Sequence, residues 1–137
     1  MRLWHYKLIP LLPRQQLLGQ HRECCALRGN GWGKKHSVVD YVFTHSPLLL
    51  VQYHMEVINE LERRGYIVES SWKEPSYRGK NCECYTNLPS LKTAYHYPEH
   101  DEAYLEECLA NLAAKGVFID KSNNPIGANK KGTVAVR

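Results

Sequence analysis

The segment from Ser46 to Gly65 carries the clearest helical signature in the chain and limits the folds open to it. Ser46 is a residue type that caps helix N-termini, and Pro47 suits the first helical position, where a backbone N–H has no partner. Gly65 supplies a common stop signal. Apolar residues recur on one face: Leu50, Tyr53 or His54, Val57, Ile58 and Leu61. The pattern predicts an amphipathic helix with one face in a core.

Two further segments predict helices that can cover this face. One follows Pro13 and stops near Gly29, and the other runs from about Glu99 to Lys115. Their apolar sides carry Leu17, Leu18, His21, Cys24 and Cys25, and Tyr104, Leu105, Cys108, Leu109 and Leu112, respectively. Strand signals are weak, and residues 67–98 have an irregular pattern. The expected fold class is therefore all-α, a three-helix single domain with long loops.

The length of 137 residues fits one domain. We expect a helical domain over residues 1–120 and a basic, flexible tail over residues 121–137. The apolar runs are far shorter than the roughly 18 residues that a membrane helix needs, and no signal peptide is visible. We therefore expect no membrane partner and a cytoplasmic location, close to the nucleoid if the substrate is DNA.

Charge is distributed unevenly along the chain. Residues 1–36 hold seven basic residues and one acid, a net charge of +6, and residues 121–137 carry +4 with no acid. The middle of the chain carries −6, which gives the overall net charge of +4. Basic ends around an acidic middle favour a polyanionic partner, most simply nucleic acid, although solvated basic stretches are also common.

A glycine-rich, cationic loop extends from Arg28 to His36. Its glycines allow close backbone approach, Lys34 and Lys35 suit phosphate, and Trp32 can stack on a base. A plain connector with Trp32 packed in the core explains the loop equally well. The loop matches neither a Walker A sequence nor a dinucleotide fingerprint, so the sequence gives no support to a nucleotide cofactor.

Glu23 is the one acid among the first 36 residues. A carboxylate in a cationic groove repels the polyanion that the groove attracts, which is a liability for binding unless the carboxylate takes part in chemistry. A surface glutamate paired with Arg22 or Arg28 is the simpler interpretation from spacing alone.

The cysteines offer a weak metal hypothesis. Five cysteines, an odd number, fit a reducing compartment better than a disulfide framework. Cys82 and Cys84, with His96 and His100 downstream, suggest zinc, but zinc sites usually separate paired cysteines by two to four residues. A loop thiol pair without a role is the more economical interpretation.

Several stretches together resemble the pyrimidine-dimer DNA glycosylases, the endonuclease V family of phage and bacterial repair enzymes. Residues 15–23 read QQLLGQHRE, like the first helix of that family, and the opening MRLW resembles its bacterial members. The helix from HSP at 45–47 to ERRGY at 62–66, and YRG at 77–79, are similar to other family segments. The resemblance covers most of residues 1–115.

The resemblance implies a three-helix all-α fold and a DNA-repair glycosylase with AP-lyase activity. Such enzymes remove one base of an ultraviolet photodimer through an imine formed by the N-terminal amine, and a helix-one acid assists. Carried over residue by residue, the catalytic groups are Met1 and Glu23, and Arg2 and Arg22 match the family's arginines. No metal or other cofactor is implied, and the partner is double-stranded DNA with damaged bases.

The residues themselves are compatible with these roles. An α-amine has a pKa of about 7.7–8.0, so part of it is neutral near pH 7 and able to attack a sugar carbon. We therefore expect Met1 and Glu23 to be catalytic, and we expect the DNA contacts to come from Arg2, Arg22, Arg28, Trp32, Lys34 and Lys35. A non-catalytic nucleic-acid-binding module on the same fold is the alternative.

Overall fold

The computed structural model describes residues 2–29, 39–86, 88, 96–119 and 134–136, and it confirms the all-α class. Three α-helices dominate these residues: α1 (Arg14–Arg28), α2 (Pro47–Arg63) and α3 (Glu102–Ala114). Short 3-10 helices and two short strands complete the elements: η1 (Tyr6–Leu11), η2 (Asp40–Thr44), η3 (Ser70–Lys73), β1 (Tyr66–Val68) and β2 (Val134–Val136).

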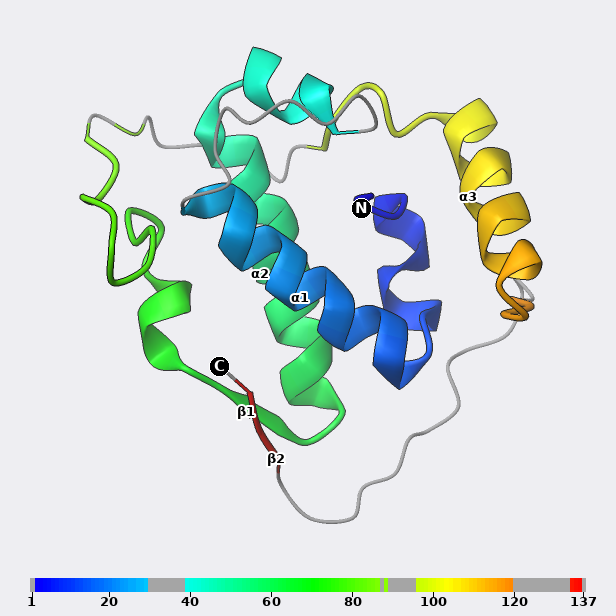
Figure 1. The fold of residues 1–137 in the computed structure, drawn as a ribbon, viewed down its shortest axis with the longest axis horizontal. Helices are drawn as coiled ribbons and strands as arrows, with labels where there is room; N and C mark the ends of the chain where they lie inside the picture. The colour runs from blue at the N-terminus through cyan, green and yellow to red at the C-terminus, as the bar shows by residue number, and fades with distance from the viewer. Residues whose placement is uncertain (1, 30–38, 87, 89–95, 120–133, 137) are drawn as a thin grey trace.

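Helix α2 forms as the sequence predicts. The Ser46 Oγ accepts a hydrogen bond from the Leu48 N–H (3.2 Å), and Pro47 occupies the first helical position. Gly65 adopts a left-handed φ of 98° just after the helix, a conformation that side chains disfavour. Most of the buried residues of α2 are apolar, although His54 and Glu60 are also buried, and the helix lies behind α1 in Figure 1.

Helix α1 crosses α2 and ends where predicted, at the Gly29 cap. The helix follows Pro13, as expected, but this proline has extended backbone and precedes the first helical residue, Arg14, instead of occupying the first helical position that prolines suit. The buried face of α1 mixes apolar and polar side chains: Leu17, Gln20, His21, Cys24, Leu27 and Arg28.

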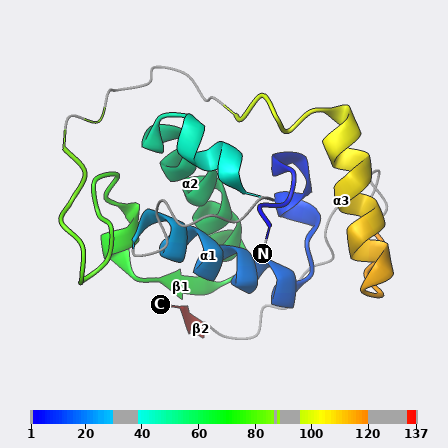
Figure 2. The same cartoon turned by 45° about the horizontal axis from the view of Figure 1, so that its top comes forward.

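Helix α3 starts three residues later than predicted. The Asp101 backbone is extended, and its carboxylate accepts from the Tyr104 N–H (2.9 Å), which fixes the helix start at Glu102. In Figures 1 and 2 the helix lies to one side, with the N-terminal segment and η1 between it and α1. The contacts between α3 and the N-terminal segment therefore help to position that segment.

A small parallel pair of strands was not expected from the sequence. Strand β1 follows α2 directly, and β2 from the far end of the tail pairs with it, Ile67 opposite Ala135. The tail therefore contributes a strand at residues 134–136. Residues 120–133, which hold most of the predicted tail, lie outside the described residues.

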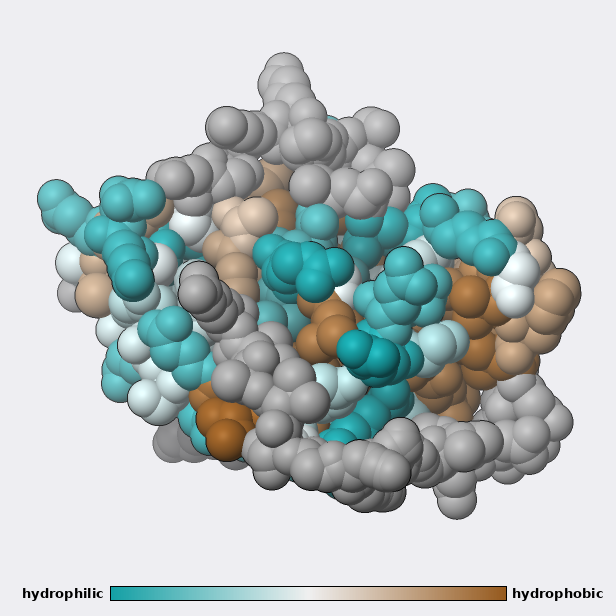
Figure 3. All heavy atoms as spheres, turned by 60° about the horizontal axis from the view of Figure 1, so that its bottom comes forward, coloured by the Kyte–Doolittle hydropathy of each residue, from teal (hydrophilic) through white to brown (hydrophobic). Residues whose placement is uncertain are grey.

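Figure 3 shows one face, on which apolar surface gathers at the right of the view, on the side where α3 lies. Phe118, just after α3, is 80% exposed. Among the described helices, none has both the length and the hydropathy to cross a membrane.

A buried histidine at the start of the α3 region predicts a pH-dependent stability. His100 accepts a hydrogen bond at Nδ1 from the Tyr6 N–H (3.2 Å), so its proton lies on Nε2 and is donated to the Tyr41 hydroxyl (2.7 Å). Burial, with His5 and His96 nearby, lowers the pKa of His100 from 6.5 to about 3. The folded protein therefore keeps this ring neutral where the unfolded chain protonates it.

The free energy of unfolding should fall as the pH drops below 6.5, the pKa of His100 in the unfolded chain. Between about pH 6.5 and about pH 5, we expect this group to remove roughly 2 kcal/mol from the free energy of unfolding. Urea denaturation at the two pH values measures this decrease in the free energy of unfolding. In His100→Gln, the decrease between the two pH values should be smaller by roughly 2 kcal/mol. An equal loss in the variant and the natural protein would contradict the assignment.

Candidate active site at the N-terminal segment

The first described residues are held against α1 by buried hydrogen bonds to their backbone. Gln20 makes two of them. Its Nε2 donates to the Arg2 carbonyl (2.8 Å), and its Oε1 accepts from the Trp4 N–H (2.7 Å). Gln20 is only 3% exposed. Because one planar amide holds two backbone groups two residues apart, both the position and the direction of this segment are fixed.

Two tyrosines hold the same segment from the other helices. The Tyr53 hydroxyl of α2 donates to the Trp4 carbonyl (2.6 Å), and the Tyr104 hydroxyl of α3 donates to the Leu3 carbonyl (2.6 Å). We refer to Gln20, Tyr53 and Tyr104 as the N-terminal clamp. Burial raises the pKa of both tyrosines, so their hydroxyls remain protonated donors near neutral pH. All three α-helices therefore position the start of the chain.

Glu23 lies on α1 one turn after Gln20. Residues three apart on a helix are neighbours on its surface, so the carboxylate lies on the side of α1 that the N-terminal segment crosses. The side chain is half-buried, and its Oε2 atom is buried. Met1, the predicted partner of Glu23, lies outside the described residues. The contact between them thus stays a prediction.

Arg2 extends to α3, where it pairs with Glu107. Its Nη1 donates to the Glu107 carboxylate (2.9 Å), and its guanidinium lies 5.8 Å and 5.9 Å from the ring centroids of Trp4 and Tyr104. These contacts place the Arg2 guanidinium beside the first residues of the chain, and the guanidinium is already paired with Glu107. A phosphate that binds Arg2 has to compete with Glu107.

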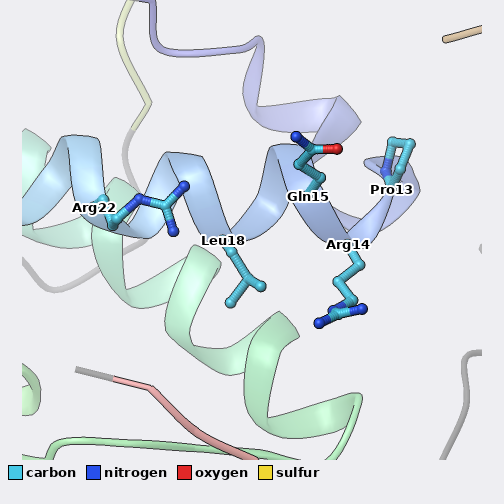
Figure 4. Close-up of a pocket in the computed structure, with 5 residues that line it drawn as sticks. All are labelled: Pro13, Arg14, Gln15, Leu18 and Arg22. Carbon is cyan, nitrogen blue, oxygen red and sulfur yellow. The ribbon is translucent and has the colours of Figure 1, made fainter.

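Arg22 is exposed and lines a surface pocket along α1. The cavity has a volume of about 450 Å³ and is lined by Pro13, Arg14, Gln15, Leu18 and Arg22 (Figure 4). Positions 14, 18 and 22 recur every four residues, which puts them on one stripe of the helix. Arg14 was not among the predicted contacts, although the same basic segment and helical period would have indicated it.

Arg28 was predicted to contact DNA, and the structure places it in the core instead. It is 0% exposed, and its guanidinium donates to the carbonyls of Trp72 (3.0 Å), Glu74 (2.9 Å) and Tyr77 (2.8 Å). The same Nη1 lies 2.9 Å from Nδ1 of His54. This guanidinium is taken up by the backbone around η3 and is not available to a phosphate.

Three predicted DNA contacts, Trp32, Lys34 and Lys35, fall outside the described residues, as Met1 does. Of the zinc candidates, His96 donates to Glu56 (2.7 Å) and His100 is buried in its own hydrogen bonds. Within the described residues neither joins Cys82 and Cys84 in a ligand group. Among the residues that the structure describes, the potential metal ligands that do come together are His21, Cys25 and His54.

The helical fold and the exposed arginines along α1 are compatible with a protein that binds DNA. A family model described as pyrimidine dimer DNA glycosylase matches residues 1–74, more than half of the chain. The chain belongs to that family. The matched region contains the Gln20 and Tyr53 parts of the clamp, together with Arg22 and Glu23.

The other comparisons add no relative. No curated protein and no solved structure matches the chain. Family membership makes the protein a DNA glycosylase, an enzyme of DNA repair that binds DNA. The resemblance drawn from the sequence is thereby confirmed at the level of the family.

Proposed function

We propose that this enzyme excises pyrimidine dimers or related damaged bases from double-stranded DNA and then cleaves the backbone at the abasic site. The nucleophile is the α-amine of Met1, and Glu23 is the assisting carboxylate. The observation that carries the proposal is the N-terminal clamp. Two buried side chains, Gln20 and Tyr53, and the half-buried Tyr104 hold the backbone of residues 2–4 against α1, the helix that bears Glu23.

Covalent geometry supports an encounter of the two groups. The Met1 amine can lie at most about 7 Å from the Arg2 carbonyl, since each residue spans no more than about 3.6 Å. Gln20 binds that carbonyl, and the Cβ atoms of residues three apart on a helix are about 5–6 Å apart. The amine of a mature chain that begins at Met1 is therefore within reach of Glu23.

The chemistry needs one neutral amine and one ionised carboxylate. The amine nitrogen attacks C1′ of the damaged nucleotide as the base leaves with the bonding electrons, and the Glu23 carboxylate stabilises the positive charge that develops at C1′. The nitrogen then loses a proton and the ring oxygen leaves C1′ to give an imine. The imine acidifies the 2′ proton, whose removal expels the 3′ phosphate by β-elimination.

DNA binding in this proposal uses the exposed arginines of α1. Arg14 and Arg22 line one pocket, and guanidinium groups match the geometry of phosphate oxygens. Arg2 remains a candidate next to the reaction centre, and Trp32, Lys34 and Lys35 remain candidates from the sequence. Reaching C1′ requires extrusion of a nucleotide, which costs a few kcal/mol and least where a lesion weakens stacking.

Trapping with borohydride tests the imine directly. Protein whose N-terminal Met1 has been verified by sequencing is incubated with abasic or photodimer-containing duplex and borohydride, which reduces an imine to a stable amine. We expect a covalent protein–DNA adduct. Acetylation of the terminus, or one added residue before Met1, should abolish the adduct and leave salt-sensitive DNA binding in place.

Two outcomes contradict the proposal. An adduct that forms equally well with a blocked terminus assigns the nucleophile to a lysine side chain. Binding without any adduct, from protein with a verified free amine, supports a non-catalytic nucleic-acid-binding module instead.

A further inference from the structure

Three potential metal ligands meet between α1 and α2, on a face that the proposed reaction does not use. His21 and Cys25 are four residues apart on α1, and His54 comes from the middle of α2. Because residues 21 and 25 are each two positions from Glu23, helical geometry turns them to the opposite side of α1 from that carboxylate. Both histidines are 0% exposed, and Cys25 is half-buried.

The donor atoms converge closely. His21 Nδ1 lies 2.9 Å from His54 Nε2, and Cys25 Sγ lies 4.0 Å and 3.9 Å from the same two nitrogens. Zinc bonds of about 2.0–2.1 Å to nitrogen and 2.3 Å to sulfur give tetrahedral edges of about 3.3 Å and about 3.6 Å. Shifts of less than about 0.5 Å in each separation would match these edges.

From this convergence we propose that His21 Nδ1, Cys25 Sγ and His54 Nε2 bind a thiophilic divalent cation, with zinc the best fit to the donor set. Two imidazole nitrogens and one thiolate are the ligand types that zinc prefers over magnesium or calcium. A tetrahedral site needs a fourth ligand beyond the three that the described residues bring together, and water can supply it.

Arg28 determines how protons and charge balance in this site. Its Nη1 lies 2.9 Å from Nδ1 of His54, so the His54 proton lies on Nε2 and is donated to His21 Nδ1 in the ion-free protein. Histidine binds zinc as a neutral imidazole, so the His54 proton moves to Nδ1 when the ion takes Nε2, and Arg28 Nη1 keeps its bond to the Trp72 carbonyl. Binding therefore releases one proton, from the Cys25 thiol, and the thiolate offsets one of the two charges of the ion.

The ion would join α1 to α2 from behind the Glu23 face. It is a structural element in this proposal, and no step at the sugar passes through it. The inference does not rest on the proposed imine chemistry, because its donors and their geometry are independent of Met1. A failure of one proposal leaves the other intact.

Metal binding by the reduced, chelator-treated protein is the test. Equilibrium dialysis with zinc should give one ion per chain, and cobalt as a probe should show a tetrahedral spectrum with a thiolate-to-metal charge-transfer band. Zinc should also raise the Tm, and a chelator should reverse the rise. Protein that retains no stoichiometric zinc and shows no thiolate band with cobalt overturns the proposal.

Substitutions of the proposed ligands test whether the ion binds to His21, Cys25 and His54. Cys25→Ser and His54→Gln, each checked for helical content by circular dichroism, should lose the bound ion and the cobalt–thiolate band. The double variant Cys82→Ser/Cys84→Ser is the matched control, and it should retain both. Zinc that survives in folded Cys25→Ser, or that disappears in the double variant, contradicts the assignment.

Discussion

Glu23→Gln should lower strand cleavage at an abasic site by about 10²- to 10⁴-fold, the range that a positioned carboxylate contributes in acid–base steps. The amide keeps the shape of the side chain but cannot carry the negative charge that stabilises the cation at C1′ or accept a proton. Because Glu23 repels phosphate, DNA binding should stay unchanged or become tighter. Gel-based cleavage and an equilibrium binding assay at the same salt concentration separate the two effects.

Arg22→Gln is the matched control, because it changes the neighbouring residue on the same helix. Its side chain is exposed in the α1 pocket and makes no part of the N-terminal clamp. We expect weaker DNA binding by Arg22→Gln and a salt slope reduced by about one unit, with borohydride trapping intact at saturating DNA.

Strand cleavage by Glu23→Gln at the rate of the natural protein would remove Glu23 from the mechanism, whatever the role of Met1.

Arg28→Met should cause the largest loss of stability of any change considered for this chain. The guanidinium satisfies the carbonyls of Trp72, Glu74 and Tyr77 and lies 5.2 Å from the Trp72 ring centroid. Leaving a buried carbonyl without a donor costs about 1–3 kcal/mol, so we expect a total loss of about 3–5 kcal/mol. That is a large part of the 5–15 kcal/mol available to a small domain.

Urea denaturation at neutral pH measures this effect, with Arg14→Met as the matched control. Arg14 is an exposed arginine on the same helix, and its replacement should change stability by about 0.5 kcal/mol or less. Arg28→Lys should fall between the two, because an ammonium cannot donate in the same planar fork. Equal stabilities of the Arg28→Met and Arg14→Met proteins would show that the carbonyls find other donors.

Arg28 also shows where charge counting fails. Arg28 begins a glycine-rich basic loop in the sequence, and from its charge alone it is predicted to contact DNA. Its position continues the stripe of Leu17, His21 and Cys24 at spacings of four, three and four, which is the buried face of α1. The helical period therefore contained the correct signal, but a cation in an apolar stripe is usually discounted because burying it requires several partners.

The N-terminal clamp had no comparable signal. Gln20 lies 16 residues from Trp4, and Tyr104 lies 101 residues from Leu3. No local pattern marks a glutamine or a tyrosine as the partner of a distant backbone group. The same is true of His54, whose meeting with His21 and Cys25 depends on how two helices cross.

The sequence by itself determined the three helices, the ends of α1 and α2 near their glycines, and the family, because caps and apolar periodicity act within a few neighbouring residues. Only the tertiary structure decided that Arg28 is internal, that Arg2 pairs with Glu107, and that the chain start is fixed beside α1. These features depend on which helix faces meet, and that is set by packing the whole core at once.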